Sequence, residues 1–323
     1  MGASATPRRA EPGRAQIAVA VSGGRDSTAL LHATLCAARP LGIQVHALHV
    51  HHGLQPQADA WPSAVRAQCR RWGAQFHLTR LQGRPAPAES VEAWARRERY
   101  AALAAMAQAA GCDAVLLAQH RRDQAETVLL QLMRGAGARG LAAMPAAVQR
   151  AGITWLRPWR DHPRQAIEAY VQRHRLGYVD DASNHDPRFA RNRLRQAVWP
   201  ALDAAFPGAE AALASAAGRA ADEASALREL AESDALAVCP TGDLIVSAWL
   251  ALSAARRVLQ LRQAIERWTG QGAPQTLVQR LSADLPRCPS GQWPAPGGWL
   301  RLRRGRLAWL PTDDARGKAR RND

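Results

Sequence analysis

The sequence predicts an α/β fold with a doubly wound, mostly parallel sheet, followed by a smaller, mainly helical C-terminal domain. Short apolar runs at 17–21, 44–50 and 114–118 are each followed by a helical pattern. This alternation is typical of strands buried in a parallel sheet that helices cover. The alanine-rich stretch 208–237 predicts one long helix after the sheet. A chain of 323 residues is long enough for two domains.

The first strand, 17–21, runs into the sequence S-G-G-R-D-S, and a helix is expected to follow through Leu35. Two glycines let the backbone turn tightly and approach a ligand. The N–H groups at the start of a helix favour negative charge. The spacing therefore predicts a phosphate-binding loop in which hydroxyls donate to phosphate oxygens and one carboxylate holds a metal ion. The expected phosphate-binding residues are Ser22, Gly23, Gly24, Arg25, Asp26 and Ser27, with Asp26 as the metal ligand; the S-G-G-x-D-S spacing resembles the loop of enzymes that split ATP, which implies that these residues bind ATP and that the metal is Mg²⁺.

The second strand, 44–50, runs into a group of histidines that raises the question of a zinc site. Strand alternation sends His49 and His51 to one side and His52 to the other. No nearby carboxylate or cysteine completes a tetrahedral set. We therefore expect a loop at the carboxyl edge of the sheet, where ligands of doubly wound folds bind. A helix over about 58–72 should follow.

Residues 90–110 have the pattern of a long helix with a basic face. Arg96 and Arg99 are three residues apart and Tyr100 is four from Arg96, so the three side chains share one side of the helix. A solvated charged face is the ordinary explanation of such a pattern. The functional alternative is a surface that binds phosphate or RNA.

A third buried strand, 114–118, precedes a helix in which Asp123 and Glu126 lie three residues apart on one face. Asp123 as the N-cap with Glu126 three positions later would make a purely structural capping pair. Two carboxylates on one face could instead bind a cationic substrate. The helix ends in a glycine-rich loop with two arginines, 134–141, which is either a helix stop or a second phosphate-binding segment.

A basic cluster in 188–195 and a Trp-Pro pair at 199–200 complete the expected first domain. The cluster contains four arginines around Asn192, and it either is solvated or contacts polyphosphate or RNA. An arginine and leucine hairpin is expected at 299–309, with its guanidinium groups on one side. The expected organisation is a disordered lead-in (1–14), a catalytic domain (15–203), a domain for tRNA or substrate binding with a long linking helix (204–311), and a disordered tail (312–323).

The composition favours a nucleic-acid partner inside a reducing compartment. The formal net charge is +16, and every basic residue among the 43 lysines and arginines is arginine except Lys318. Arginine forks suit phosphates, although an arginine-rich composition also reflects codon bias. The five cysteines are scattered with no C-x-x-C pair, which argues against a metal–thiolate site and fits the cytoplasm. No apolar run is long enough to span a membrane.

Five segments together resemble the bacterial tRNA(Ile)-lysidine synthase family, within the PP-loop ATP-pyrophosphatase superfamily. They are SGGRDS (22–27), HVHHGL (49–54), ARRERY (95–100), HRRDQAETVLLQLMRGAGARGL (120–141) and the D-A-S-N to R-N-R-L-R segment (181–195). The first motif alone indicates only the superfamily, whereas the fourth is specific. Arg25 departs from the family pattern, in which that variable position is usually smaller or apolar, and it is expected to add charge near the phosphates.

The resemblance implies a ligase that joins L-lysine to C2 of the wobble cytidine, position 34, in an isoleucine tRNA with a CAU anticodon. ATP first adenylates the cytidine, and AMP and pyrophosphate are released, with Mg²⁺ as cofactor. The family often forms homodimers, and the sequence leaves the oligomeric state open. The implied catalytic residues are Asp26, Asp123 and Glu126, and the implied lysine or tRNA contacts are Arg96, Arg99, Arg191, Asp123 and Glu126. Two alternatives remain: a PP-loop tRNA thiolase and a non-catalytic RNA-binding protein.

Overall fold

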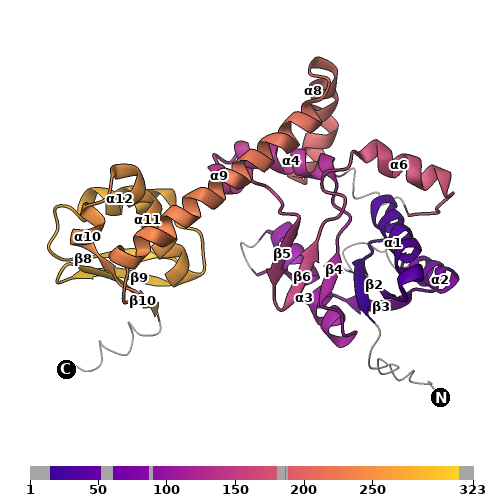
Figure 1. Cartoon of the computed structure of the whole chain (residues 1–323), viewed down its shortest axis with the longest axis horizontal. Coiled ribbons are helices and arrows are strands. Elements are labelled where there is room, and N and C mark those ends of the chain that lie inside the picture. The colour runs from indigo at the N-terminus through magenta and orange to yellow at the C-terminus, as the bar shows by residue number, and fades with distance from the viewer. Residues whose placement is uncertain (1–14, 52–60, 87–89, 180–185, 187, 313–323) are drawn as a thin grey trace. The chain divides into compact units, whose positions relative to one another are not determined.

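The computed structural model describes residues 15–51, 61–86, 90–179, 186 and 188–312 (Figure 1). The chain divides into two compact units, Met1–Ala221 and Asp222–Asp323. The division falls inside helix α9 (Ala209–Val238). This helix confirms the long alanine-rich helix that the sequence predicted over 208–237. The lead-in 1–14, the tail from 313 onward and His52 lie outside the described residues. No helix in the described part of the chain is long and apolar enough to cross a membrane.

The first unit contains the predicted doubly wound sheet, with strand order β3-β2-β1-β4-β6-β5. All neighbouring strands are parallel except the pair β5 and β6. The strands are β1 (Gln16–Ala20), β2 (Gln44–His51), β3 (Gln75–Arg80), β4 (Ala114–Leu116), β5 (Ala147–Arg150) and β6 (Ile153–Leu156). The sequence did not indicate β5, because its four residues are all exposed and lack an apolar alternation.

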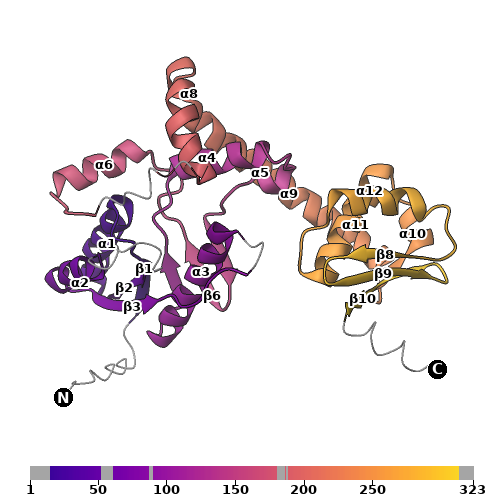
Figure 2. The ribbon, with the colours of Figure 1, turned by 180° about the vertical axis from the view of Figure 1, so that it is seen from behind.

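Helices cover both faces of this sheet (Figures 1 and 2). One core, which includes Leu103 and Trp155, lies beneath α3, and the other, which includes Leu31 and Val65, lies beneath α1 and α2. The helices are α1 (Arg25–Ala38), α2 (Trp61–Trp72), α3 (Val91–Ala109), α4 (Arg121–Leu132), α5 (Ala138–Leu141), α6 (Arg164–Arg173), α7 (Ala190–Arg193) and α8 (Trp199–Ala205). A π-helical turn, Leu194–Val198, joins α7 to α8.

The order of the strands reverses at β1, whose neighbours are β2 on one side and β4 on the other. In an open α/β sheet, ligands bind at the carboxyl ends of the strands where the order reverses. The S-G-G-R-D-S loop follows β1, and the segment that opens α4 follows β4. The topology therefore brings the S-G-G-R-D-S motif and the motif that begins at His120 to one edge of the sheet.

The second unit combines helices with a four-stranded antiparallel sheet of order β7-β10-β9-β8. Its core includes Trp249, Leu261, Leu281 and Leu300, all fully buried. Its elements are β7 (Leu244–Ile245), α10 (Val246–Leu250), α11 (Ala254–Thr269), α12 (Gln275–Asp284), β8 (Gly291–Ala295), β9 (Gly298–Arg303) and β10 (Arg306–Pro311).

The hairpin predicted at 299–309 is confirmed as β9 and β10. Leu300 and Leu302 are buried in the core, so the alternate positions, Arg301 and Arg303, lie on the other side of the ribbon. Strand β8 was not expected, because Pro294 interrupts its sequence and a proline disfavours a strand. This unit therefore contains more sheet than the sequence indicated.

Candidate active site

The hydroxyls of the S-G-G-R-D-S loop hold the loop in shape. Ser22 Oγ and Ser27 Oγ are 3.0 Å apart, and the backbone N–H of Gly24 donates to Ser22 Oγ at 3.3 Å. Gly23 has φ +92°, a conformation that L side chains rarely adopt. Gly24 is the N-cap residue of α1 and has no side chain to cap the first turn. Among the described residues no side chain caps the first N–H groups of α1, which is the arrangement that an anion-binding helix start requires.

A buried histidine of β2 forms a hydrogen bond with the residue directly before the loop. The Nδ1–H of His49 donates to the carbonyl of Val21 at 2.7 Å, and His49 is 2% exposed. His51 is also buried. Within the described residues no cluster of histidines, cysteines and carboxylates could hold a metal ion. His49 therefore joins the end of β2 to the residue that precedes the loop.

His120 connects the loop to helix α4. Its Nε2 lies 3.6 Å from Asp26 Oδ2, and its Nδ1 lies 3.5 Å from Asp123 Oδ2. His120 is 3% exposed, so water screens its charge less than at the surface, although the side chain of Asp26 is 32% exposed. The sequence motif contained this histidine, but nothing in the sequence assigned it a role, since Asp26 is far away along the chain.

The charges around His120 shift two pKa values in opposite directions. Burial would raise the pKa of Asp26, but the hydrogen bond and charge of His120 and the charge of Arg25 lower it to about 2. Burial would lower the pKa of His120, but the Asp26 hydrogen bond and the charges of Asp123, Asp26 and Glu126 raise it. Asp26 is therefore ionised at neutral pH, and His120 binds its proton more tightly than a histidine in water.

Asp123 is not the N-cap of α4, so that structural alternative is wrong. His120 is the N-cap, and Asp123 is the third helical residue, whose Oδ2 accepts the backbone N–H of His120 at 3.1 Å. Asp123 therefore still satisfies one free N–H of the helix start. Glu126 lies one turn further on and has no capping role at this position.

The two carboxylates of α4 are paired with arginines from the basic cluster. Arg195 Nε lies 2.7 Å from Glu126 Oε1, and Arg195 Nη2 lies 2.9 Å from Asp123 Oδ1. Arg191 Nη1 lies 3.9 Å from Asp123 and its Nε lies 3.7 Å from Glu126. Glu126 is completely buried. Because a buried carboxylate needs compensating charge, this pairing fixes the 188–195 segment against α4.

One oxygen of Glu126 is left without a hydrogen bond. Among the described residues, Glu126 Oε2 and His120 Nδ1 have no hydrogen-bond partner, although both are buried. Arg191 Nε lies 3.7 Å from Oε2, too far for a hydrogen bond. Most buried polar atoms are hydrogen-bonded, so an open acceptor at this place indicates a binding position for a ligand N–H.

The basic face of α3 lies near this pair. The guanidinium carbons of Arg96 and Arg99 lie 5.2 and 5.9 Å from the ring centre of Tyr100, which confirms that the three share a face. Desolvation by the surrounding protein, together with the charges of Arg96 and Arg191, lowers the pKa of Arg99. The arginines predicted separately on α3 and α7 therefore influence one another electrostatically.

Arg25 is held by carboxylates on both sides. Its Nη1 lies 2.7 Å from Glu168 Oε1 of α6, and its Nε lies 3.1 Å from Asp26 Oδ1. The charge that the sequence placed near the phosphates is therefore partly neutralised, and Arg25 instead joins α6 to the loop.

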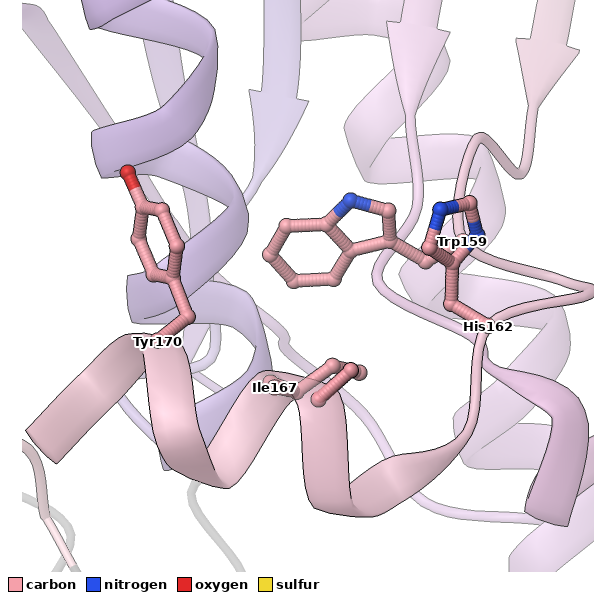
Figure 3. A pocket seen from close by; sticks show the side chains of 5 residues that line it. Trp159, His162, Ile167 and Tyr170 are labelled. Carbon is pink, nitrogen blue, oxygen red and sulfur yellow. The ribbon is translucent and has the colours of Figure 1, made fainter. Parts of the chain in front are cut away.

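A small pocket lies on the neighbouring face of α6 (Figure 3). Three residues of α6 line it, Ala166, Ile167 and Tyr170, together with Trp159 and His162, which precede the helix. In Figure 3 the Trp159 ring lies between Tyr170 and His162. No predicted site residue lines this pocket, so we locate the chemistry at the loop and α4 instead.

Comparison with known proteins agrees with the motifs. The family model described as "PP-loop domain" matches residues 5–202. The chain is 43% identical over 271 residues to a "tRNA(Ile)-lysidine synthase" of Ralstonia nicotianae, covering 83% of this chain and 57% of that one. It is 42% identical to the protein of the same name in Bordetella bronchiseptica, covering 88% and 83% of the two chains. The chain thus spans little more than half of the Ralstonia relative and most of the Bordetella one.

A solved structure shares the fold. It is titled "U34-tRNA thiolase NcsA from Methanococcus maripaludis with its [4Fe-4S] cluster", with a TM-score of 0.55 and 14% sequence identity, covering 64% of this chain and 71% of that one. At this identity the likeness concerns the fold alone.

Replacing Gly23 by alanine should destabilise the loop and weaken ATP binding. The new side chain would sit at a positive φ, and its Cβ would lie 3.1 Å from Val65 Cγ2. We expect a loss of about 1–3 kcal/mol in the free energy of unfolding, measured by urea denaturation, together with a raised Kd for ATP. Gly272→Ala, which lies outside the loop and whose Cβ meets nothing within 4 Å, is the control. Unchanged stability and ATP affinity in Gly23→Ala would contradict the described loop.

His120 should give the protein a stability that depends on pH above 6.5. Its pKa in the folded chain is raised above the ordinary 6.5, so its contribution is complete below pH 6.5 and is lost as pH rises through the folded value. We expect the free energy of unfolding to fall over this range in the wild type and to change less in His120→Gln. Urea denaturation at a series of pH values measures this. Equal slopes in both proteins would show that His120 is not held by these carboxylates.

Proposed function

The chain belongs to the tRNA(Ile)-lysidine synthase family, and we propose that it uses ATP to join L-lysine to C2 of a tRNA wobble cytidine. The proposed substrate is the isoleucine tRNA with a CAU anticodon, modified at position 34. One observation supports the proposal most: His120 joins Asp26 of the phosphate-binding loop to Asp123 of α4. An ATP-cleaving loop and a site for a cationic substrate are therefore adjacent.

The first proposed step activates the cytidine. The oxygen on C2 of cytosine is a poor leaving group, so it must be activated before lysine can replace it. This oxygen attacks the α-phosphorus of ATP, and pyrophosphate leaves. The N–H groups at the start of α1 and the hydroxyls of Ser22 and Ser27 stabilise the charge on the phosphates. Asp26 is ionised and its side chain is 32% exposed, so it suits Mg²⁺, which binds through one or two carboxylates and phosphate oxygens. When bound, Mg²⁺ would neutralise phosphate charge.

The second proposed step transfers lysine. Its ε-amine, with a pKa of about 10.4 in water, must lose a proton before it attacks C2 and expels AMP. We assign the ammonium groups of lysine to Asp123 and Glu126, one of which acts as the base. Glu126 Oε2 supports this assignment, because it is a buried acceptor without a hydrogen bond among the described residues.

Arginines around the two carboxylates are proposed to bind the anionic parts of the substrates. Arg96, Arg99 and Arg191 are assigned to the lysine carboxylate, the phosphates or the RNA backbone. The electrostatic influence of Arg191 on Arg99 supports a shared anionic ligand. The sequence predicted Arg195 only as one of the four arginines of the 188–195 cluster. Its contacts with both carboxylates support the role of holding them in place.

The second unit is proposed to bind tRNA while residues 15–203 perform the chemistry. Its hairpin has Arg301 and Arg303 on the side of β9 opposite the core, and a wobble base must leave its stack to be adenylated. Thiolase chemistry is less well supported. Burial raises the pKa of the Cys69 and Cys112 thiols to about 11, so both stay protonated and unreactive at neutral pH.

Substituting either carboxylate of α4 should impair lysine transfer. We expect Asp123→Asn and Glu126→Gln each to raise the KM for lysine by about 10²-fold, since breaking a buried charge pair costs about 2–5 kcal/mol. Incorporation of labelled lysine into a tRNA(Ile) transcript measures this. Asp113→Asn, an exposed carboxylate before β4, is the matched control. Unchanged lysine KM and kcat in both variants would rule out the assignment.

Binding of tRNA should depend steeply on salt, because arginines that neutralise phosphates release counterions. We expect the logarithm of Kd to rise linearly with the logarithm of the NaCl concentration, and Arg303→Gln to lower that slope by about one. Filter binding at several salt concentrations measures the slopes. An affinity insensitive to salt would contradict an RNA-binding role for the basic surface.

A further inference from the structure

A buried glutamate at the start of α9 binds two arginines of α4. Glu210 Oε1 lies 3.0 Å from Arg121 Nε, and Glu210 Oε2 lies 2.8 Å from Arg122 Nε. Glu210 is 6% exposed, whereas Arg121 and Arg122 have side-chain exposures of 29% and 13%. One buried carboxylate thus accepts hydrogen bonds from two adjacent guanidinium groups.

Helix α8 adds to this contact through the second arginine. Arg122 Nη2 lies 3.0 Å from Asp203 Oδ2, which also accepts the indole N–H of Trp199 at 2.9 Å. The guanidinium carbon of Arg122 lies 4.0 Å from the centre of the Trp199 ring. We call the five residues Arg121, Arg122, Trp199, Asp203 and Glu210 the α4 clamp.

The α4 clamp holds the turn from which the proposed lysine ligands project. Arg121 and Arg122 are the first two residues of α4, directly before Asp123 and one turn before Glu126. On the other side, the backbone N–H of Arg121 donates to the carbonyl of His162 at 3.0 Å. The position of both carboxylates therefore depends on contacts that do not touch the reacting groups.

Charge gives Glu210 a second effect on the same site. Arg121 and Arg122 stand beside Asp123, and without a partner either could compete for that carboxylate. Buried ion pairs often contribute little net stability compared with apolar packing, so their value lies in fixing one arrangement. Glu210 holds both guanidinium groups, and it so leaves Asp123 and Glu126 to their contacts with Arg195 and, in the proposed function, to lysine.

We propose that Glu210 is a positioning residue for the lysine-transfer step. It acts through Arg121 and Arg122 to place Asp123 and Glu126, and it takes no part in cutting ATP. This inference rests on the proposed function. It predicts that loss of the Glu210 charge affects lysine use much more than it affects adenylation, because misplacing a reacting group by about 1 Å can cost about 10²-fold in rate.

The test compares Glu210→Gln with Glu223→Gln, an exposed glutamate on the same helix. Lysine KM and kcat, ATP KM, and pyrophosphate release with tRNA but without lysine are measured for each protein, with circular dichroism as a check on folding. For Glu210→Gln we expect the lysine kcat/KM to fall between about 10-fold and 10²-fold. Pyrophosphate release and ATP KM should stay near wild type, and Glu223→Gln should match the wild type throughout.

A second variant covers the case in which Glu210→Gln does not fold. Arg121→Gln keeps the contact between Glu210 and Arg122, and it should show the same selective loss in smaller degree. Glu210→Asp, which retains the charge, should recover part of the lysine kcat/KM. Equal losses in lysine use and pyrophosphate release, or a lowered melting temperature with unchanged lysine kinetics, would overturn the inference. A wild-type chain that does not incorporate lysine into the tRNA would overturn the proposed function instead.

Discussion

The buried negative charge on α4 is the constraint on which the rest of the site depends. Glu126 is completely buried and Asp123 nearly so, and a buried carboxylate is costly unless it is paired. Arg195 and Arg191 supply the compensating charge, which brings the 188–195 segment onto α4. The helix that bears the carboxylates is in turn fixed at its start, so the polar cluster is held from several sides.

The topology of the sheet makes this cluster useful for chemistry. Strand order reverses at β1, and the segments after β1 and β4 emerge together at that edge. His120 joins them, with Asp26 on one side and Asp123 on the other. The S-G-G-R-D-S loop and the two carboxylates of α4 thus belong to one connected network, which is the arrangement that the proposed two-substrate reaction requires.

Features coded by neighbouring residues could be predicted from the sequence. Spacing along one element determines three such features. They are the turn between β1 and α1, the shared face of Arg96, Arg99 and Tyr100, and the buried leucines of the terminal hairpin. Ion pairs between residues distant in the sequence could not be predicted, because no local pattern links the two partners. Arg195 pairs with Glu126, and Glu210 pairs with Arg121. The alternative that made Asp123 the N-cap of α4 was wrong, since His120 is an uncommon N-cap and Asp123 a common one.

The chemical identity of nucleoside 34 tests the central claim most directly. A tRNA(Ile) transcript with a CAU anticodon is incubated with the chain, ATP, Mg²⁺ and lysine, then digested to nucleosides and analysed by mass spectrometry. The account predicts a cytidine enlarged by one lysine residue, formed only when ATP and lysine are both present. An unmodified cytidine, or a sulfur-containing base when a sulfur donor is supplied, would contradict it.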